Sequence, residues 1–251
     1  MHFETNLIIY FLAAIAIGIF IFGIIDLIFL WRVGKEPTLN TDIRINRWIK
    51  YFLKSIFFQN QIVEYGFLPW LTHIMIFYGF LNLFVLTSLQ FFLTWLISSN
   101  TAIVIYFKTG VGNLGMAVWG DFWGLILLTG ILLALFRRYV LKPEYFNTIS
   151  EDAIAIWLLF IITVSGFLCE IIRLAVRPES YDAAYSFAVY WMMPLIDGFK
   201  LTETHLSFLF YLHGIISLIF IAYIPFSKFK HILTSPLTFA FVSAGSQYSK
   251  N

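Results

Sequence analysis

The sequence predicts an all-α membrane protein built as a bundle of five transmembrane helices, and three observations support this. Of its 251 residues, 60% are hydrophobic and only 12% are charged, whereas soluble domains are roughly 45–50% apolar and about 25% charged. Five apolar stretches are each long enough to cross a hydrocarbon core, which takes about 20 helical residues. Helices are expected because backbone polar groups in lipid must be satisfied within the protein.

The expected spans follow in chain order and form one membrane domain over residues 1–251. They are residues 7–30, 67–93, 114–136, 153–175 and 206–231. The residues before the first span lack the positive run of a signal peptide, so the first apolar stretch is expected to stay in the membrane.

A basic segment lies between the first two spans, at about residues 40–58. Arg44, Arg47, Lys50 and Lys54 alternate there with apolar side chains. This spacing predicts an amphipathic helix at the membrane surface, with a structured loop as the alternative.

Basic residues near the span ends predict the orientation. They are more frequent after the first and third spans and in the tail than on the opposite side. By the positive-inside rule, the N-terminus is outside and the C-terminus is cytoplasmic. The protein is therefore expected to be a multi-pass protein of the cell (cytoplasmic) membrane.

Cys169 is the only cysteine. Iron–sulfur clusters usually need four thiolates and a disulfide needs two, so the chain cannot build either alone.

The histidines carry the functional hypothesis. His73 lies in the second span, His205 and His213 lie in the fifth, and His231 lies at that span's inner end. His213 and His231 are 231 − 213 = 18 residues apart, which in a continuous helix is five turns and a rise of about 27 Å. Both rings would then project from one face, one near mid-membrane and one at the inner surface. This spacing suits two metal centres stacked across the bilayer.

Haem iron accepts imidazole as an axial ligand, and a helix bundle can hold the porphyrin between facing helices. Gly79, Gly214 and the Gly120–Gly124 pair are the small residues expected to line the slot. The alternative is that His73 and His213 are polar contacts between helices. Zinc is the weaker metal candidate, since no carboxylate or thiolate stands at ligand spacing from these histidines.

Four stretches resemble the membrane cytochrome b subunits of the respiratory nitrate reductase gamma family. The nearest branch is the heterodisulfide reductase cytochrome b subunit, together with related membrane subunits of sulfate-reducer redox complexes. The matching stretches are residues 70–80 (WLTHIMIFYGF), 112–115 (GNLG), 165–173 (SGFLCEIIR) and 225–231 (PFSKFKH).

The resemblance implies five helices, an outer N-terminus and haem b. It pairs His73 with His231 around an inner haem and makes His213 a ligand of an outer haem. The family pattern has a second histidine ten residues after the first, where this chain has Leu83. The outer haem is therefore expected to be five-coordinate or to use another ligand such as His205, and it could also be absent. His205 is eight residues from His213, about 80° away on an ideal helix, which favours a site-lining or interfacial role.

Glu170 and Arg173 share a face near the outer end of the fourth span. They are candidates, with His205, for a quinone site that relays protons. A local ion pair is the alternative for Glu170 and Arg173.

Together these features predict an electron-transfer subunit of a quinol- or quinone-linked oxidoreductase complex. It would exchange electrons between a quinone or similar carrier and an iron–sulfur partner on the cytoplasmic face. The docking candidates are the segment at 40–58, the loop at 137–150 and the C-terminal tail. No nucleic acid is expected as a partner. The alternatives are a cofactor-free anchor and a transporter subunit.

Overall fold

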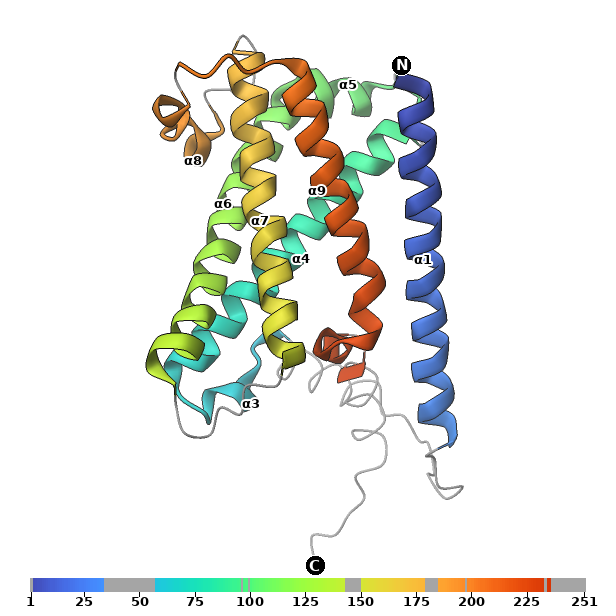
Figure 1. The fold of residues 1–251 in the computed structure, drawn as a ribbon, viewed down its shortest axis with the longest axis vertical. Coiled ribbons are helices and arrows are strands. Elements are labelled where there is room, and N and C mark those ends of the chain that lie inside the picture. Colours follow the sequence, from blue (N-terminus) through green and yellow to red (C-terminus); the bar gives the residue numbers. More distant parts are fainter. Residues whose placement is uncertain are drawn as a thin grey trace, which may run out of the picture. The chain divides into compact units, whose positions relative to one another are not determined.

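The computed structural model describes residues 2–33, 57–95, 97–98, 100–142, 150–178, 185–196, 198–232 and 234–235. This part of the chain is helical and contains no strand. Its long helices are α1 (His2–Val33), α4 (Phe67–Trp95), α6 (Val111–Phe136), α7 (Ser150–Val176) and α9 (Glu203–Tyr223) (Figure 1). Its shorter helices and turns are α3 (Asn60–Val63), α5 (Ala102–Thr109), η2 (Arg137–Leu141), α8 (Phe187–Tyr190), η4 (Met193–Leu195), η5 (Ile224–Phe226) and η6 (Lys228–Lys230).

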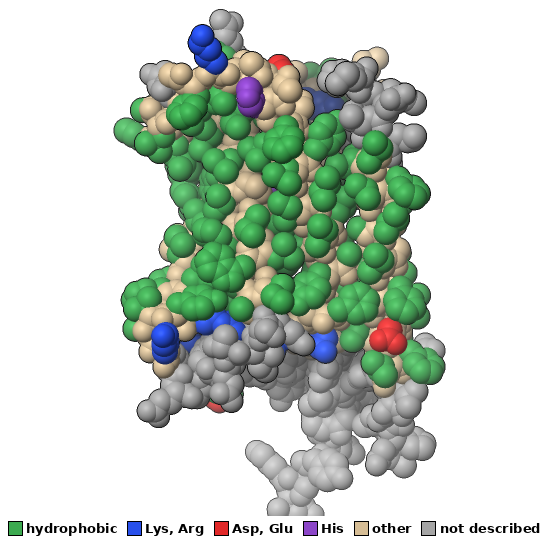
Figure 2. Space-filling model, viewed as in Figure 1, with side chains coloured by type: hydrophobic (Ala, Val, Ile, Leu, Met, Phe, Trp, Pro, Cys, Tyr) green, Lys and Arg blue, Asp and Glu red, His purple; other side chains and the backbone are tan. Residues whose placement is uncertain are grey.

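Five helices in the described part are long and apolar enough to cross a membrane, which confirms the predicted fold class. These spans are Ile8–Leu30, Phe67–Thr94, Val111–Leu141, Ala153–Val176 and Glu203–Phe226. Hydrophobic side chains follow the helices on the face drawn in Figure 2, and most charged side chains lie near helix ends. Such exposed apolar surface is what lipid contact requires. The orientation and the surface helix at 40–58 stay predictions, and residues 40–56 lie outside the described residues.

The chain divides into two compact units. Unit 1 comprises Met1–Trp70, Asn147–Ala155 and Ile215–Asn251, and unit 2 comprises Leu71–Phe146 and Ile156–Gly214.

In unit 1, α1 packs against the turn that follows α9. A Cβ atom added to Gly23 would lie 2.5 Å from Cβ of Pro225, so only glycine permits this approach. The ring centroids of Phe220 and Phe229 lie 5.3 Å apart, and the Ser227 hydroxyl accepts a hydrogen bond of 3.1 Å from the Phe229 N–H. These contacts fold the chain back at the end of the fifth span.

The fifth helix is shorter than the predicted 206–231, and this corrects the geometry assumed for His213 and His231. The α-helix ends at Tyr223 and is followed by two 3₁₀ turns, with Pro225 in the first. Proline lacks the N–H that would continue the helical ladder, and Ser227 is extended, with φ −101° and ψ 178°. The five-turn phase and the 27 Å rise therefore do not apply.

In unit 2, glycines bring the long helices into close contact. A Cβ atom on Gly79 would lie 2.8 Å from the backbone N of Leu127, and one on Gly130 would lie 3.0 Å from the N of Ile76. These two sites set the approach of α4 and α6, as small residues do between membrane helices. Gly79 was expected to line a haem slot, and the structure instead packs it against α6.

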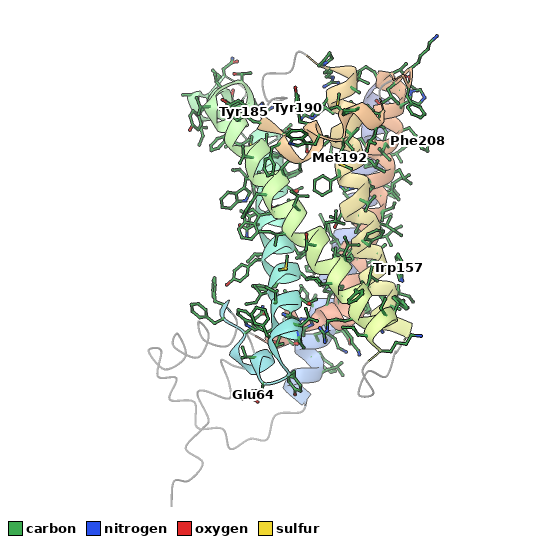
Figure 3. All side chains as sticks on the ribbon, turned by 90° about the vertical axis from the view of Figure 1, so that its left-hand side faces the viewer. Glu64, Trp157, Tyr185, Tyr190, Met192 and Phe208 are labelled. Atoms are coloured by element: carbon green, nitrogen blue, oxygen red, sulfur yellow. The ribbon has the colours of Figure 1, made fainter. Side chains whose placement is uncertain are left out.

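Three further contacts hold α7 in unit 2. A Cβ atom on Gly124 of α6 would lie 2.8 Å from the ring of Phe167. Nε1 of Trp157, labelled in Figure 3, donates a hydrogen bond of 3.0 Å to the hydroxyl of Tyr139 in η2, which follows α6. Between the end of α7 and the start of α9, the Arg177 guanidinium donates two hydrogen bonds to Glu203, of 2.7 and 2.9 Å, and these bonds raise the pKa of Arg177.

Candidate functional site

The site with the clearest geometry is the imidazole of His213, which meets α7 at Ser165. Nδ1 of His213 and Oγ of Ser165 are 2.8 Å apart. The Ser165 hydroxyl donates its single proton to the carbonyl oxygen of Ile162 at 3.0 Å. With the Ser165 proton on that carbonyl, Nδ1 of His213 is the donor in this pair and Nε2 is the basic nitrogen of the ring.

A glycine opens space beside the same ring. A Cβ atom on Gly166 would lie 3.4 Å from Cε1 of His213, at ordinary contact distance. Any larger side chain would have to share the space that the imidazole occupies. Ser165 and Gly166 belong to a stretch that carries the family resemblance, but their spacing predicts no role for either. Only the packing of α7 on α9 reveals that they face His213.

His231 has the same tautomer for a different reason. Its Nδ1 is hydrogen-bonded to the carbonyl oxygen of Lys228. A carbonyl can only accept, so Nδ1 carries the proton and Nε2 is again basic. The side chain is exposed, in the turn after η6. Metal-ligating histidines typically donate their other ring N–H to an oxygen in this way, which fixes the tautomer and the ring orientation.

His205 shows the opposite arrangement. Its Nδ1 accepts a hydrogen bond of 3.2 Å from the Thr202 backbone N–H and lies 2.7 Å from the Thr202 hydroxyl. The neutral ring then carries its proton on Nε2 and has no basic nitrogen left for iron. The side chain is exposed at the start of α9. This geometry favours the interfacial role for His205 over the role of an axial ligand.

His73 lies half-buried in α4 and belongs to unit 2, whereas His231 belongs to unit 1. The expected pairing of His73 with His231 stays a prediction. Within the described residues, no group of three or more His, Cys, Asp or Glu side chains could hold a metal ion. Axial ligation of haem does not need such a group, since the porphyrin supplies the other ligands.

The residues around His213 fit a haem ligand on two observations. The bond to Ser165 leaves Nε2 basic, which is the form that binds iron. Gly166 places no side-chain atom of its own against Cε1 of the ring. A histidine that served only as a polar contact between helices would need the hydrogen bond to Ser165 and would not need a glycine beside its ring.

Glu170 and Arg173 form the expected pair on α7 and have a third partner. Nη2 of Arg173 lies 3.0 Å from Oε1 of Glu170, and the two side chains are 28% and 27% exposed. The Ser186 hydroxyl donates a hydrogen bond of 2.7 Å to the same oxygen. The pair is therefore tied to the segment that contains α8, whose Tyr190 and Met192 are labelled in Figure 3.

Comparison with known proteins places the chain in a family. Residues 49–239 match the HdrE family, described as the E subunit of dihydromethanophenazine:CoB–CoM heterodisulfide reductase. The HdrE protein of Methanosarcina acetivorans is 29% identical to this chain over 90% of the chain and 88% of the relative. That of Methanosarcina thermophila is 28% identical, with the same coverage.

A relative of another description is also similar. The EtfAB:quinone oxidoreductase of Syntrophomonas wolfei is 28% identical over 93% of this chain and 33% of its own length. The match therefore covers one part of a longer protein. No solved structure matches the chain.

Proposed function

This chain belongs to the HdrE family of heterodisulfide reductases and is a membrane redox subunit; from that premise we propose that it carries haem b and passes electrons between a lipid-soluble carrier and an iron–sulfur partner. The observation that supports this best is the hydrogen bond between Nδ1 of His213 and Ser165, because it leaves Nε2 basic inside an apolar span. When bound, haem iron supplies one-electron redox chemistry at membrane depth.

Two haem groups are proposed. His73 and His231 hold an inner haem, and His213 holds an outer one. The exposed His231 is oriented by the Lys228 carbonyl, and His213 by Ser165. The position expected to supply the outer haem's second ligand is Leu83. Since His205 accepts through Nδ1, a five-coordinate outer haem is the arrangement that these contacts favour.

The carrier is proposed to be a two-electron, two-proton aromatic compound. The names of the relatives specify a dihydromethanophenazine in one case and a quinone in the other. The reduced form of either carrier, a dihydrophenazine or a quinol, gives up protons together with electrons, and the oxidised form takes them up, so the site needs groups in the membrane that exchange protons. Glu170, Arg173 and the interfacial His205 are the candidates for that site. The partly exposed ion pair of Glu170 and Arg173 supports this assignment.

An iron–sulfur partner is proposed because Cys169 is the only cysteine of the chain and clusters usually need four thiolates. By the positive-inside rule this partner docks on the cytoplasmic face of the cell membrane. Its docking surfaces are the segment at 40–58, the loop at 137–150 and the C-terminal tail. Residues 143–149 and 236–251, within these surfaces, lie outside the described residues.

An optical spectrum of the complex, purified with its partner subunits, tests the proposal. Reduced-minus-oxidised bands of b-type haem are expected, and haem quantitation should give two groups per chain. His213→Ala should remove part of the signal. A featureless visible spectrum would instead favour a cofactor-free anchor or a transporter subunit.

A further inference from the structure

A second buried group, outside the histidines, lies in unit 2. Asp121 of α6 is 1% exposed, about 15 Å along the helix from Val111 at 1.5 Å per residue. Its Oδ2 accepts a hydrogen bond of 2.7 Å from the Ala188 N–H. Its Oδ1 is buried and has no hydrogen-bond partner within the described part of the chain. Burying an ionised carboxylate with an unsatisfied oxygen is costly, so this oxygen is suited to carrying a proton.

The surroundings of Asp121 connect it to Glu170. Ser186 and Ala188 are two residues apart, and one donates to Glu170 while the other donates to Asp121. The charges of Glu170 and Arg173 both act on the Asp121 carboxyl group. Ser186 is fully buried, whereas Glu170 and Arg173 are partly exposed. A proton at Asp121 therefore has a neighbouring carboxylate that reaches toward the surface.

The same helix faces connect Asp121 to His213. Gly166, beside the His213 ring, lies four residues before Glu170, on the same face of α7. Gly124, which packs on Phe167 of α7, lies three residues after Asp121, on the same face of α6. Asp121 is thus about one helical turn beyond the level of the Gly124–Phe167 contact. His213 and Asp121 belong to the same unit, whose apolar interior screens charges weakly, so a charge added at a haem held by His213 would raise the proton affinity of Asp121.

A structural role explains only half of these observations. Asp121 holds the α8 segment through the hydrogen bond between Oδ2 and the Ala188 N–H. An amide would do the same without the cost of a buried charge. The orphan oxygen Oδ1 and the neighbouring Glu170 need a further explanation.

We propose that Asp121 is a proton-binding site linked to electron arrival at the haem held by His213, an inference that rests on the proposed function. With haem bound, one-electron oxidation of the carrier would break one of its O–H or N–H bonds, the haem would take up the electron, and the released proton would form an O–H bond at Oδ1 of Asp121. The added negative charge and the added proton cancel within the membrane. When the electron moves on, the proton leaves by way of Glu170. Two such steps account for both electrons and both protons of the carrier.

Equilibrium redox titration of the purified complex at a series of pH values tests this. The midpoint potential of the His213-dependent haem should fall as the pH rises, by up to 59 mV per pH unit. For a one-electron couple this is a tenfold change in the equilibrium constant. In Asp121→Asn, whose amide oxygen can still accept from Ala188, this dependence should flatten. Asp26→Asn, the same change at an exposed position of α1, should keep the wild-type slope.

Infrared difference spectra of the same complex give a second measurement. Reduction should produce the carbonyl stretch of a protonated carboxyl group, and that band should disappear in Asp121→Asn and shift in Asp121→Glu. A slope or band unchanged by Asp121→Asn overturns the inference and leaves the proposed function standing. Loss of the outer haem from Asp121→Asn also overturns it, in favour of a structural role. A wild-type complex without haem overturns both.

Discussion

Nδ1 of His213 on α9 and Oγ of Ser165 on α7 form a hydrogen bond of 2.8 Å. With the Ser165 proton on the Ile162 carbonyl oxygen, 3.0 Å away, Nδ1 is the donor and the bond fixes the imidazole tautomer. Two helices that are far apart in the sequence thereby leave Nε2 of His213 as the basic nitrogen of the ring.

Removing the Ser165 hydroxyl should weaken haem binding at His213 without abolishing it. Mutation of such orienting partners typically costs about 10–100-fold in metal affinity. Ser165→Ala should therefore lower the outer haem content at limiting haem, measured by haem quantitation and spectral titration. Thr163→Val is the matched control, because Thr163 also bonds a carbonyl of α7, that of Leu159. Equal haem loss in both variants would contradict an orienting role for Ser165.

Filling the space beside the His213 ring should displace the ring. The Cβ position of Gly166 already lies 3.4 Å from Cε1, so the added methyl groups of Gly166→Val would collide with the imidazole. This variant should lose the His213-dependent part of the haem spectrum, whereas Gly166→Ala should keep most of it. Gly115→Val, at a position with nothing within 4 Å, should have a normal spectrum. A normal spectrum for Gly166→Val would show that haem binding does not use this face.

Single histidine variants should separate the two proposed haems. His73→Ala and His231→Ala should each remove the same spectral signal, because a bis-imidazole haem is lost when either ligand is removed. His213→Ala should remove a different signal, resolved by low-temperature spectra or redox titration. If His73→Ala and His213→Ala abolish one shared signal, the pairing proposed here is wrong.

Gly79→Ala should destabilise the packing of α4 on α6. Its Cβ atom would lie 2.8 Å from backbone atoms of Leu127, which cannot move without separating the helices. Overpacking of this kind costs about 1–3 kcal/mol, seen as a lower midpoint of thermal unfolding in detergent. Gly120→Ala is the control on α6, because its Cβ atom would meet only the flexible end of Leu86, at 3.3 Å. Equal midpoints for the two variants would contradict this packing.

The chain's pattern was informative where a rule depends on neighbours in the sequence. Span lengths follow from hydrophobic runs, and the pairing of Glu170 with Arg173 follows from a spacing of three residues. The prediction of one continuous helix over residues 206–231 was wrong at its end. The chain forms 3₁₀ turns from Ile224 onward, with Pro225 in the first. A proline near the end of an apolar run was the signal that could have corrected it.

Roles that depend on another helix could not be read from spacing. Gly79 was expected beside a cofactor and packs against Leu127 instead, because only the crossing of α4 and α6 decides which face of a glycine is covered. The donor and acceptor roles of His205 and His213 likewise depend on what each ring meets, Thr202 in one case and Ser165 in the other.

The sequence by itself determined the membrane environment, the five helices, the family and the set of histidines, since each follows from composition, run length or motif. The tertiary structure alone decided that His213 meets Ser165 and Gly166, and that Asp121 is buried under Ala188 with one oxygen unsatisfied. The reason is physical: hydrophobicity acts through the solvent and needs no partner, whereas a tautomer or a buried charge is set by atoms that only folding brings within about 3 Å.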